Sequence, residues 1–530
     1  MSQKGLSTQS VWNPLKQAFF RMLWIANVAS LIGTWMHEVG ASWLMTTLAP
    51  SPFMVAMVQT ATTTPFFLLA LPAGALADIL DRRRLLLFAQ IWMLCVSVAL
   101  GITTVAGFTT PLVLLLFTFF LSLGAAINAP AWQSVIPELV HRDDLQSAVT
   151  LGSIAFNLAR VAGPALGGIV VAALGSGATF LLNGISFLGV IVVLKGWHRE
   201  RKESILPEER LISAMKTGIR YVRNAPQVQA VLIHSIFFSI FSSSLWASLP
   251  IIARKNLGLS SLGYGILMGF FGTGALLGAP LLHWLRRKIS LNLLVWMATN
   301  LFALALLSLA FVSSLILLGM TMIAGGIAWL ILLSVFNTVV QAVIPAWVRG
   351  RVLSVYLLVF FGGMASGSAL SGTMATWIGI SEALAVMSSC LILGAFYFSR
   401  IKLTSGEELD LTPSQHWPES VVSIKPEIDE GPVLVVVEYH IDPSQLKAFT
   451  QAMNALKTIR RRDGAIKWNL FRDVTNPERY TESFIVESWG EHLRQHERMT
   501  VTDKEAEDRV RSFHIGPEHP MVRHFIAEGT

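Results

Sequence analysis

The chain has 530 residues, of which 53% are hydrophobic and only 14% charged, whereas soluble domains carry about a quarter charged residues. Residues 400–530 hold 39 of the charged side chains and residues 1–399 hold the other 34. A single soluble globular domain is therefore excluded: the composition predicts a membrane domain followed by a water-soluble one.

Apolar runs of about 20 residues, the length that crosses the hydrocarbon of a bilayer, occur twelve times before residue 400. They predict an all-α membrane domain embedded in the lipid bilayer. The predicted spans are 20–47, 53–77, 85–107, 111–136, 147–174, 177–195, 227–252, 260–284, 290–312, 315–344, 350–378 and 382–399.

The distribution of basic residues between these spans predicts their orientation. Connections on the N-terminal side carry 20 Lys and Arg, whereas those on the other side carry only Arg254 and Lys255. Because positive charge resists translocation, we expect both termini in the cytoplasm and the spans in the cytoplasmic (inner) membrane. The net charge of +7 is thereby explained by topology, and no nucleic-acid partner is predicted.

Internal repeats divide the spans into two halves, 1–195 and 227–400, joined by a charged cytoplasmic loop over 196–226. Gln133–Pro137 recurs as Gln341–Pro345, and Gly163–Gly168 recurs in part as Gly367–Gly372. Two six-helix bundles related in this way predict a transporter that alternates access to a site between them.

The rest of the chain is predicted as a linker, 401–430, and a soluble α+β domain, 431–530. Asp442-Pro443 begins a helix after a first strand at 432–441. Strands at 465–474 and 480–489, a helical stretch over 490–512 and a strand at 521–527 give a ferredoxin-like order. The apolar face of the first helix comprises Leu446, Phe449, Met453, Leu456 and Ile459.

Two charged residues lie deep within the predicted spans, Glu38 and Arg160. A charge at that depth costs about 2.5–3.5 kcal/mol on insertion scales, so it faces a wet cavity or a partner. One reading is that Glu38 carries a proton while Arg160 binds an anionic substrate or Glu38 itself. The other is a static ion pair between the first and fifth spans. His37 and His234 are interpreted as hydrogen-bonded packing residues.

Five amide side chains in the spans are candidates for lining a substrate cavity, together with Trp132, Trp246 and Trp329. Hydrogen bonding between helices explains each amide equally well. The amides are Gln59, Asn128, Gln133, Asn337 and Gln341.

Three motifs resemble known families. The loop from Gly74 to Arg84, GALADILDRRR, resembles the hallmark motif of the major facilitator superfamily, and Gly163-Pro164-Ala-Leu-Gly167-Gly168 resembles its antiporter motif. With the DRRR ending, the membrane domain looks like the enterobactin-exporter-like and drug-efflux-like branch. The segment Glu487–His496 is similar to the dimeric α+β barrel of antibiotic-biosynthesis monooxygenases.

The resemblance implies gating by this loop. Asp78 would brace the opposite bundle near the entrance of the eleventh span, with Arg349 as its partner. Three features depart from the pattern: Asp81 replaces a glycine, Ala159 replaces another, and span 111–136 has no arginine. The implied gating residues are Gly74, Asp78, Asp81, Arg82, Arg84 and Arg349.

The predicted function is secondary active transport, with protons driving the export of drug-like or siderophore-like small molecules. An importer or facilitator of the same fold is the first alternative. A membrane-tethered enzyme, in which the C-terminal domain modifies the substrate, is the second. We expect no enzyme activity, no cofactor and no metal site, because no phosphate-binding loop or ligand spacing is present. A second copy of the chain is a candidate partner for the C-terminal domain.

Overall fold

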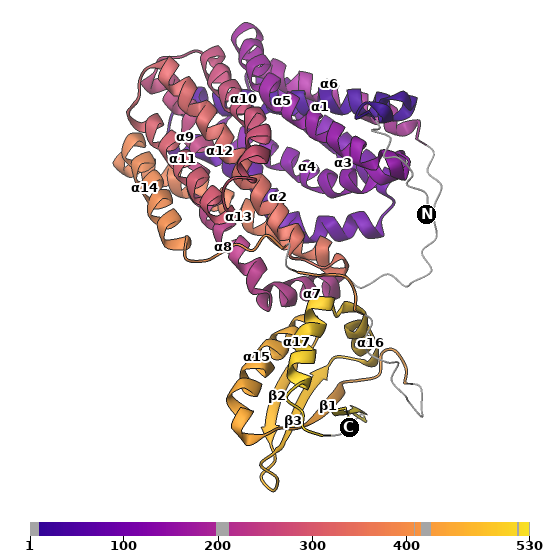
Figure 1. Cartoon of the computed structure of the whole chain (residues 1–530). Coiled ribbons are helices and arrows are strands. Elements are labelled where there is room, and N and C mark those ends of the chain that lie inside the picture. The colour runs from indigo at the N-terminus through magenta and orange to yellow at the C-terminus, as the bar shows by residue number, and fades with distance from the viewer. Residues whose placement is uncertain (1–9, 198–210, 407–408, 415–425, 517–518, 529–530) are drawn as a thin grey trace. The chain divides into compact units, whose positions relative to one another are not determined.

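The computed structural model describes residues 10–197, 211–406, 409–414, 426–516 and 519–528 (Figure 1). These residues form two compact units, which are described separately. The helical unit comprises 1–208, 232–337 and 356–402, and the C-terminal unit comprises 209–231, 338–355 and 403–530.

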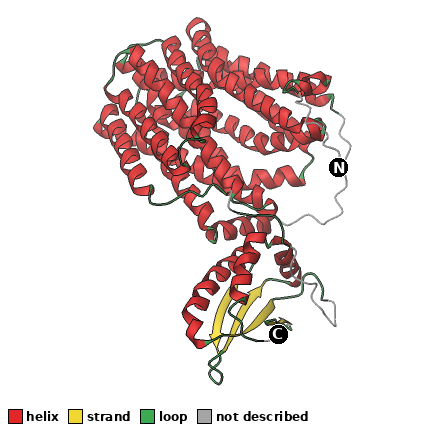
Figure 2. Ribbon diagram, in the orientation of Figure 1, coloured by secondary structure: helices red, strands yellow, loops and turns green. Residues whose placement is uncertain are grey.

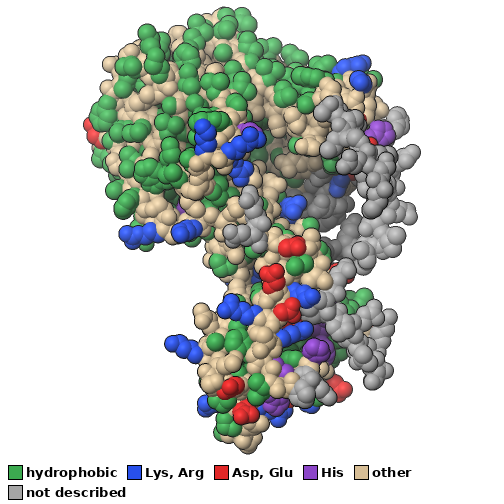
Figure 3. Space-filling model, viewed as in Figure 1, with side chains coloured by type: hydrophobic (Ala, Val, Ile, Leu, Met, Phe, Trp, Pro, Cys, Tyr) green, Lys and Arg blue, Asp and Glu red, His purple; other side chains and the backbone are tan. Residues whose placement is uncertain are grey.

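Long apolar helices account for almost all of the helical unit. Within the described residues, twelve helical spans are long and apolar enough to cross a membrane, which confirms the prediction. Hydrophobic side chains cover much of their outer surface in Figure 3. The first six are α1 (Ala18–Leu48), α2 (Pro52–Ile79), α3 (Arg82–Val105), α4 (Pro111–Leu139), α5 (Leu145–Leu174) and α6 (Ser176–Lys195).

The second six follow a short amphipathic helix, α7 (Leu211–Arg223), inside the predicted charged loop. The bounds of the others are α8 (Pro226–Ser242), α9 (Ser244–Ile251), α10 (Ser261–Leu285), α11 (Leu291–Phe311), α12 (Leu315–Ala342), α13 (Arg349–Ile378) and α14 (Ile380–Phe398).

The seventh predicted span is one transmembrane segment but two helices, because α8 ends at Ser242 and α9 begins at Ser244. The hydroxyl groups of Ser243 and Ser244 donate to the carbonyl oxygens of Ile240 and Phe241. Such side-chain bonds compete with the helical ladder and bend helices.

Strands occur, among the described residues, only in the C-terminal unit (Figure 2). The sheet order β2-β3-β1-β4, antiparallel throughout, is that of the ferredoxin-like fold the sequence predicts. The elements are β1 (Val433–His440), α15 (Leu446–Asp463), β2 (Lys467–Arg472), β3 (Arg479–Val486), α16 (Trp489–Arg498), α17 (Val501–Arg511) and β4 (Met521–Ile526).

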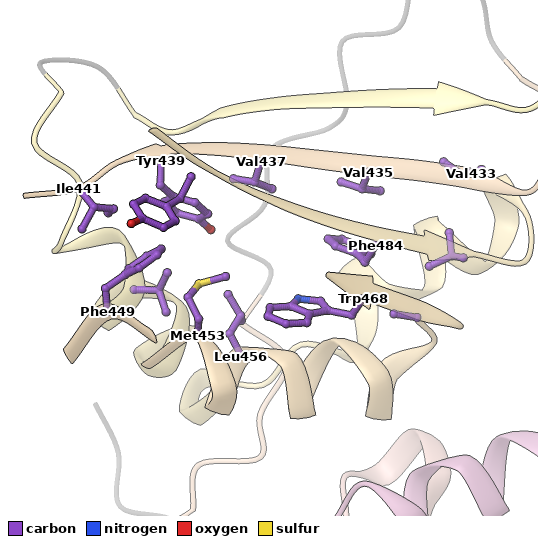
Figure 4. Close-up of a cluster of buried hydrophobic side chains, with 14 of the residues drawn as sticks. Val433, Val435, Val437, Tyr439, Ile441, Phe449, Met453, Leu456, Trp468 and Phe484 are labelled. Atoms are coloured by element: carbon purple, nitrogen blue, oxygen red, sulfur yellow. The ribbon is translucent and has the colours of Figure 1, made fainter. Parts of the chain in front are cut away.

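The core of this fold lies between one face of the sheet and α15. Val433, Val435 and Val437 alternate inward along β1 and meet Phe449 and Met453 of α15 (Figure 4). Most of the predicted apolar face of α15 is therefore buried.

The predicted helix 490–512 is two helices, and Thr500 is the reason for the break. The Thr500 side chain accepts from the Asp503 backbone, and the Asp503 carboxylate accepts from the Thr500 backbone. This reciprocal capping box starts α17 anew. Within the predicted linker, Ser414 donates its backbone N–H to the Met499 carbonyl oxygen, and Thr412 accepts from Val501.

A charged group that the apolar pattern does not reveal also lies in this core. Glu482 of β3 is fully buried and accepts hydrogen bonds from Trp468 (2.9 Å), Tyr439 (3.2 Å) and Arg460 (3.3 Å). Arg460 is 4% exposed and also contacts Glu507 at 3.4 Å. Burial raises the pKa of the Tyr439 hydroxyl, and Glu482 raises it further.

Replacing Glu482 with Gln should lower the free energy of unfolding of this domain by about 3 kcal/mol, because Arg460 loses its main counter-ion in a buried site. The measurement is hydrogen exchange of β1 and β3 in the full chain at increasing urea concentrations. Glu438→Gln is the control: its partner Arg479 is 39% exposed, so a loss below about 1 kcal/mol is expected. Equal effects of the two substitutions would contradict a structural role for the buried pair.

Candidate functional site

Glu38 and Arg160 lie on neighbouring helices of the helical unit. Helix α1, which carries Glu38, packs along α5, which carries Arg160. Their charges interact, yet no ion pair within 4.0 Å joins them in the described part of the chain. Arg160 is only 6% exposed, and its Nε has no hydrogen-bond partner among the described residues. Within these residues, the Arg160 guanidinium therefore has at least one N–H group that is available to a ligand.

Aromatic rings line the Arg160 side of this site. The Arg160 guanidinium lies over the ring of Phe271, 5.3 Å from its centre. Phe271 contacts Trp246 and Trp329, whose own ring centres are 4.4 Å apart. A cation set against flat apolar rings suits a bulky molecule with a negative or strongly polar group. The sequence names two of these rings, Trp246 and Trp329. The sequence analysis did not identify Phe271, which α10 places beside Arg160.

Tyr264 and His37 border the site on the Glu38 side. The buried Tyr264 ring stacks on Trp43, with ring centres 6.0 Å apart, and interacts with Glu38. His37 packs on Phe180 at 4.6 Å. Both ring nitrogens of His37 are buried without a partner among the described residues. The packing role predicted for His37 therefore holds, but the predicted hydrogen bond does not.

The candidate amides differ in their surroundings. Asn128 accepts a hydrogen bond from Gln90 at 3.1 Å, which links α4 to α3. Gln59 is half-buried, and Gln133, Asn337 and Gln341 are exposed. Trp132 borders a separate small pocket between α1, α4 and α5. For Asn128, bonding between helices explains the amide.

The two six-helix halves are packed together at one face of the membrane domain. This face contains the connections 49–51 and 252–260 and is called here the far face. Arg254 donates hydrogen bonds to Thr46 and Thr47 across this face. Lys255 donates to the carbonyl oxygen of Pro50 at 2.7 Å. Deeper in, α2 and α13 meet where the rings of Phe66 and Phe361 stack 4.7 Å apart. These contacts join the two halves at the far face.

The glycine motif of α5 allows this close packing. A side chain at Gly163 would strike Trp35 of α1, and one at Gly167 would lie 2.9 Å from the Met36 backbone. Gly168 faces α10 instead, where a Cβ would lie 3.1 Å from Gly265. Pro164 contributes its carbonyl oxygen to the same contact. Small residues thus let helices from the two halves touch.

Gly265→Ala should weaken the far-face contact, because its Cβ would lie 2.6 Å from the Pro164 carbonyl oxygen. Overpacking of this kind costs about 1–3 kcal/mol. We expect a lower melting temperature and reduced transport. Gly269→Ala, one turn along the same helix, is the control, since the nearest atom there is 3.8 Å away. Identical melting temperatures for the two variants would show that this contact is not tight.

The basic loop after α2 is tied to the N-terminal half. Asp81 caps α3 by accepting from the Arg84 backbone at 2.9 Å. Arg82 pairs with Glu138 at 2.7 Å, and Arg83 donates to the Leu194 and Lys195 carbonyl oxygens. The ion pair of Arg82 and the hydrogen bonds of Arg83 were not predicted. The contacts of Arg83 are typical of a basic residue at the C-terminal end of a helix, which carries a partial negative charge.

The remaining gating residues are less fully defined. Gly74 and Asp78 lie in the last turns of α2, and the Asp78 side chain lies outside the described part of the structure. Arg349 begins α13 in the C-terminal unit. Its pairing with Asp78 stays a prediction.

Comparison with known proteins gives the family. The sequence profile of the transmembrane secretion effector family, within the major facilitator superfamily, matches residues 9–530. The chain belongs to this superfamily. It is an integral membrane transporter of small molecules, and its family and relatives are transporters rather than enzymes.

Curated relatives match about three quarters of this chain. The staphyloferrin A transporter of Staphylococcus aureus is 25% identical over 390 residues, covering 73% of this chain and 96% of the relative. The multidrug efflux pump Tap of Mycobacterium tuberculosis is 26% identical over 413 residues, covering 74% and 95%. About a quarter of this chain therefore has no counterpart in these relatives.

Solved structures show the same fold. A bacterial homologue of the human lysosomal transporter Spinster, in an inward-facing unoccupied conformation, matches with a TM-score of 0.58 at 15% identity, over 73% of this chain and 97% of that one. A POT family transporter bound to 5-aminolevulinic acid matches with a TM-score of 0.61 at 14% identity, over 72% and 96%.

Proposed function

We propose that the chain is a proton-driven exporter of drug-like or siderophore-like small molecules that works by alternating access. It would lie in the cytoplasmic membrane with both termini in the cytoplasm, as the 20 to 2 distribution of Lys and Arg favours. The observation that carries the proposal is the electrostatic interaction of Glu38 with Arg160, whose guanidinium lies over the ring of Phe271 inside the helical unit.

Glu38 and Arg160 have different roles in this proposal. Glu38 is a titratable group inside the helices and takes up or releases the proton. Arg160 keeps its charge, and its Nε has no hydrogen-bond partner within the described ranges of the chain, so it can hold either Glu38 or a negative group of the substrate. The gating residues Asp78 and Arg349 would control access to this site.

The names of relatives support export and the substrate class. One relative is named a staphyloferrin A transporter and others are named multidrug efflux pumps. The resemblance of Gly163–Gly168 to an antiporter motif favours export over import or facilitated diffusion. The aromatic wall of Phe271, Trp246 and Trp329 fits bulky molecules of either class.

The C-terminal domain is proposed to be a regulatory or dimerising module that resembles antibiotic-biosynthesis monooxygenases without acting as one. The enzyme hypothesis remains the alternative, favoured by Trp489 and by the rings of His492 and His496, which meet edge to face with their centres 4.8 Å apart. Mass spectrometry of an exported compound separates the two, because an enzyme of the monooxygenase class changes the mass of the compound and a transporter does not.

Export from cells tests the proposal. In cells lacking other efflux pumps, expression of the chain should lower the accumulation of at least one compound in a panel of drugs and siderophores. A protonophore should restore that accumulation. Export that continues undiminished when the proton gradient is collapsed would contradict proton drive.

A further inference from the structure

Helix α7 and the connection between α12 and α13 belong to the same compact unit as the ferredoxin-like domain. In the chain, α7 directly precedes the second half of the membrane domain. The connection contains a short turn, Ala346–Val348, before α13 begins. Helix α7 contacts both this turn and α15 of the domain. The domain is therefore docked on the ends of membrane helices rather than tethered only by its linker.

Buried charges alternate across this docking surface. Glu491 of α16 accepts a hydrogen bond from Arg220 of α7 at 2.7 Å and another from Arg498 at 2.6 Å. The Glu491 side chain is 9% exposed and the Arg498 side chain 4%. Burial alone would raise the pKa of Glu491, but Arg498 and Arg220 outweigh it and lower that pKa. Arg494 of α16 pairs with Glu491 as well, at 3.1 Å, so Glu491 stays ionised among three cations, of which Arg220 alone comes from α7.

Aromatic rings fill the rest of the surface. Arg498 lies over the ring of Trp347, 4.5 Å from its centre. Tyr221 of α7, which is 2% exposed, contacts Trp347 edge-on at 5.8 Å. Arg462 of α15 lies over the other ring of this pair, Tyr221, at 5.4 Å. Arg462 itself pairs with Asp463 at 2.8 Å and with Asp503 at 2.6 Å, so its charge is compensated within the domain.

The contact continues to the first turn of α13. A Cβ at Gly218 of α7 would lie 3.0 Å from the Cβ of Arg351, so the two backbones are close. A chain of contacts therefore runs from Glu491 through Arg220 and α7 to Arg351. Both α12 and α13 are continuous helices that extend from this unit into the helical unit.

We propose that the ferredoxin-like domain is an intramolecular regulator, which permits transport only while it is docked through Glu491 on α7 and on the α12–α13 connection. The inference rests on the proposed transport function. Alternating access requires that the helix ends which form the gate take defined positions. When the domain is docked, the position of the first turn of α13 is fixed through α7. When it leaves, Tyr221 loses its contact with Arg462 and Trp347 loses its contact with Arg498, so that turn is held less firmly.

Arg220→Glu tests the proposal, because it places two carboxylates together in a buried site. The docked population should fall on the order of 100-fold. Hydrogen exchange of α7 and of residues 349–355, measured in the full chain, should accelerate accordingly. Export should fall about tenfold, within the usual range of coupling between sites. Arg223→Glu, exposed on the same helix, should change neither, and Arg220→Lys should retain docking.

The outcomes separate the parts of the proposal. Unchanged exchange of α7 in Arg220→Glu would overturn docking through Glu491. Faster exchange with undiminished export would overturn regulation. If no compound is exported by the unaltered chain, the transport proposal fails instead, and exchange at 349–355 still decides whether docking controls α13. Should Arg220→Glu fail to fold, Arg220→Ala removes the attraction without adding repulsion, and the same changes are expected in smaller measure.

Discussion

Replacing Glu38 with Gln should reduce gradient-driven accumulation of substrate in proteoliposomes to the level of empty liposomes. The amide keeps nearly the same volume but cannot take up or release a proton. Substrate binding should persist, because an amide resembles the protonated acid and Arg160 is still present. Accumulation with and without a pH gradient, alongside equilibrium binding, measures the two effects separately.

A purely structural role for Glu38 predicts a different result. Glu38→Gln would then leave Arg160 buried without a counter-ion, at a cost of about 3–5 kcal/mol, and the melting temperature would fall sharply. Glu382→Gln is the matched control, since Glu382 is an exposed acid in the first turn of α14. A stable Glu38→Gln protein that still concentrates substrate on a pH gradient would contradict the proton-carrier role.

Asp78→Asn should leave the protein folded in the membrane and reduce export by at least about tenfold. The reason is that an acid at the end of α2, just before Arg82, works against the insertion bias and is expected to brace the gate. The measurement is export normalised to the amount of protein in the membrane.

Asp143→Asn provides the control for this substitution. Asp143 is an exposed acid in the short turn before α5 and is not among the implied gating residues, so export should be nearly unchanged. Export by Asp78→Asn equal to that of Asp143→Asn would rule out the gating role of Asp78.

Much of the fold follows from apolar length and periodicity. The twelve spans and the strand order of the C-terminal domain depend on patterns that extend over many residues. Glu38 and Arg160 could be predicted because a charge inside an apolar run is conspicuous. Their proximity could be predicted because burial of either charge requires a partner or a polar cavity.

Features that depend on single contacts between distant segments could not be predicted. In the sequence, Arg460 comes directly after the last residue of the apolar face of α15. Its burial is explained only by the position of Glu482, with which it pairs. The sequence of α7 is typical of a charged loop, and its burial depends on the contact of Tyr221 with Trp347, which is distant in the sequence. The hydrogen bond of Asn128 to Gln90 of the neighbouring helix is a contact of the same kind, and the cavity role of the other candidate amides stays a prediction.

The central claim is that the substrate and protons are exchanged across the membrane through Glu38. The most direct measurement is the pH inside sealed proteoliposomes, followed with a trapped dye, when a transported compound is added to one side. The account predicts a proton movement opposite to that of the compound, present in the unaltered chain and lost in Glu38→Gln. Transport of the compound by the unaltered chain with no accompanying proton movement would contradict it.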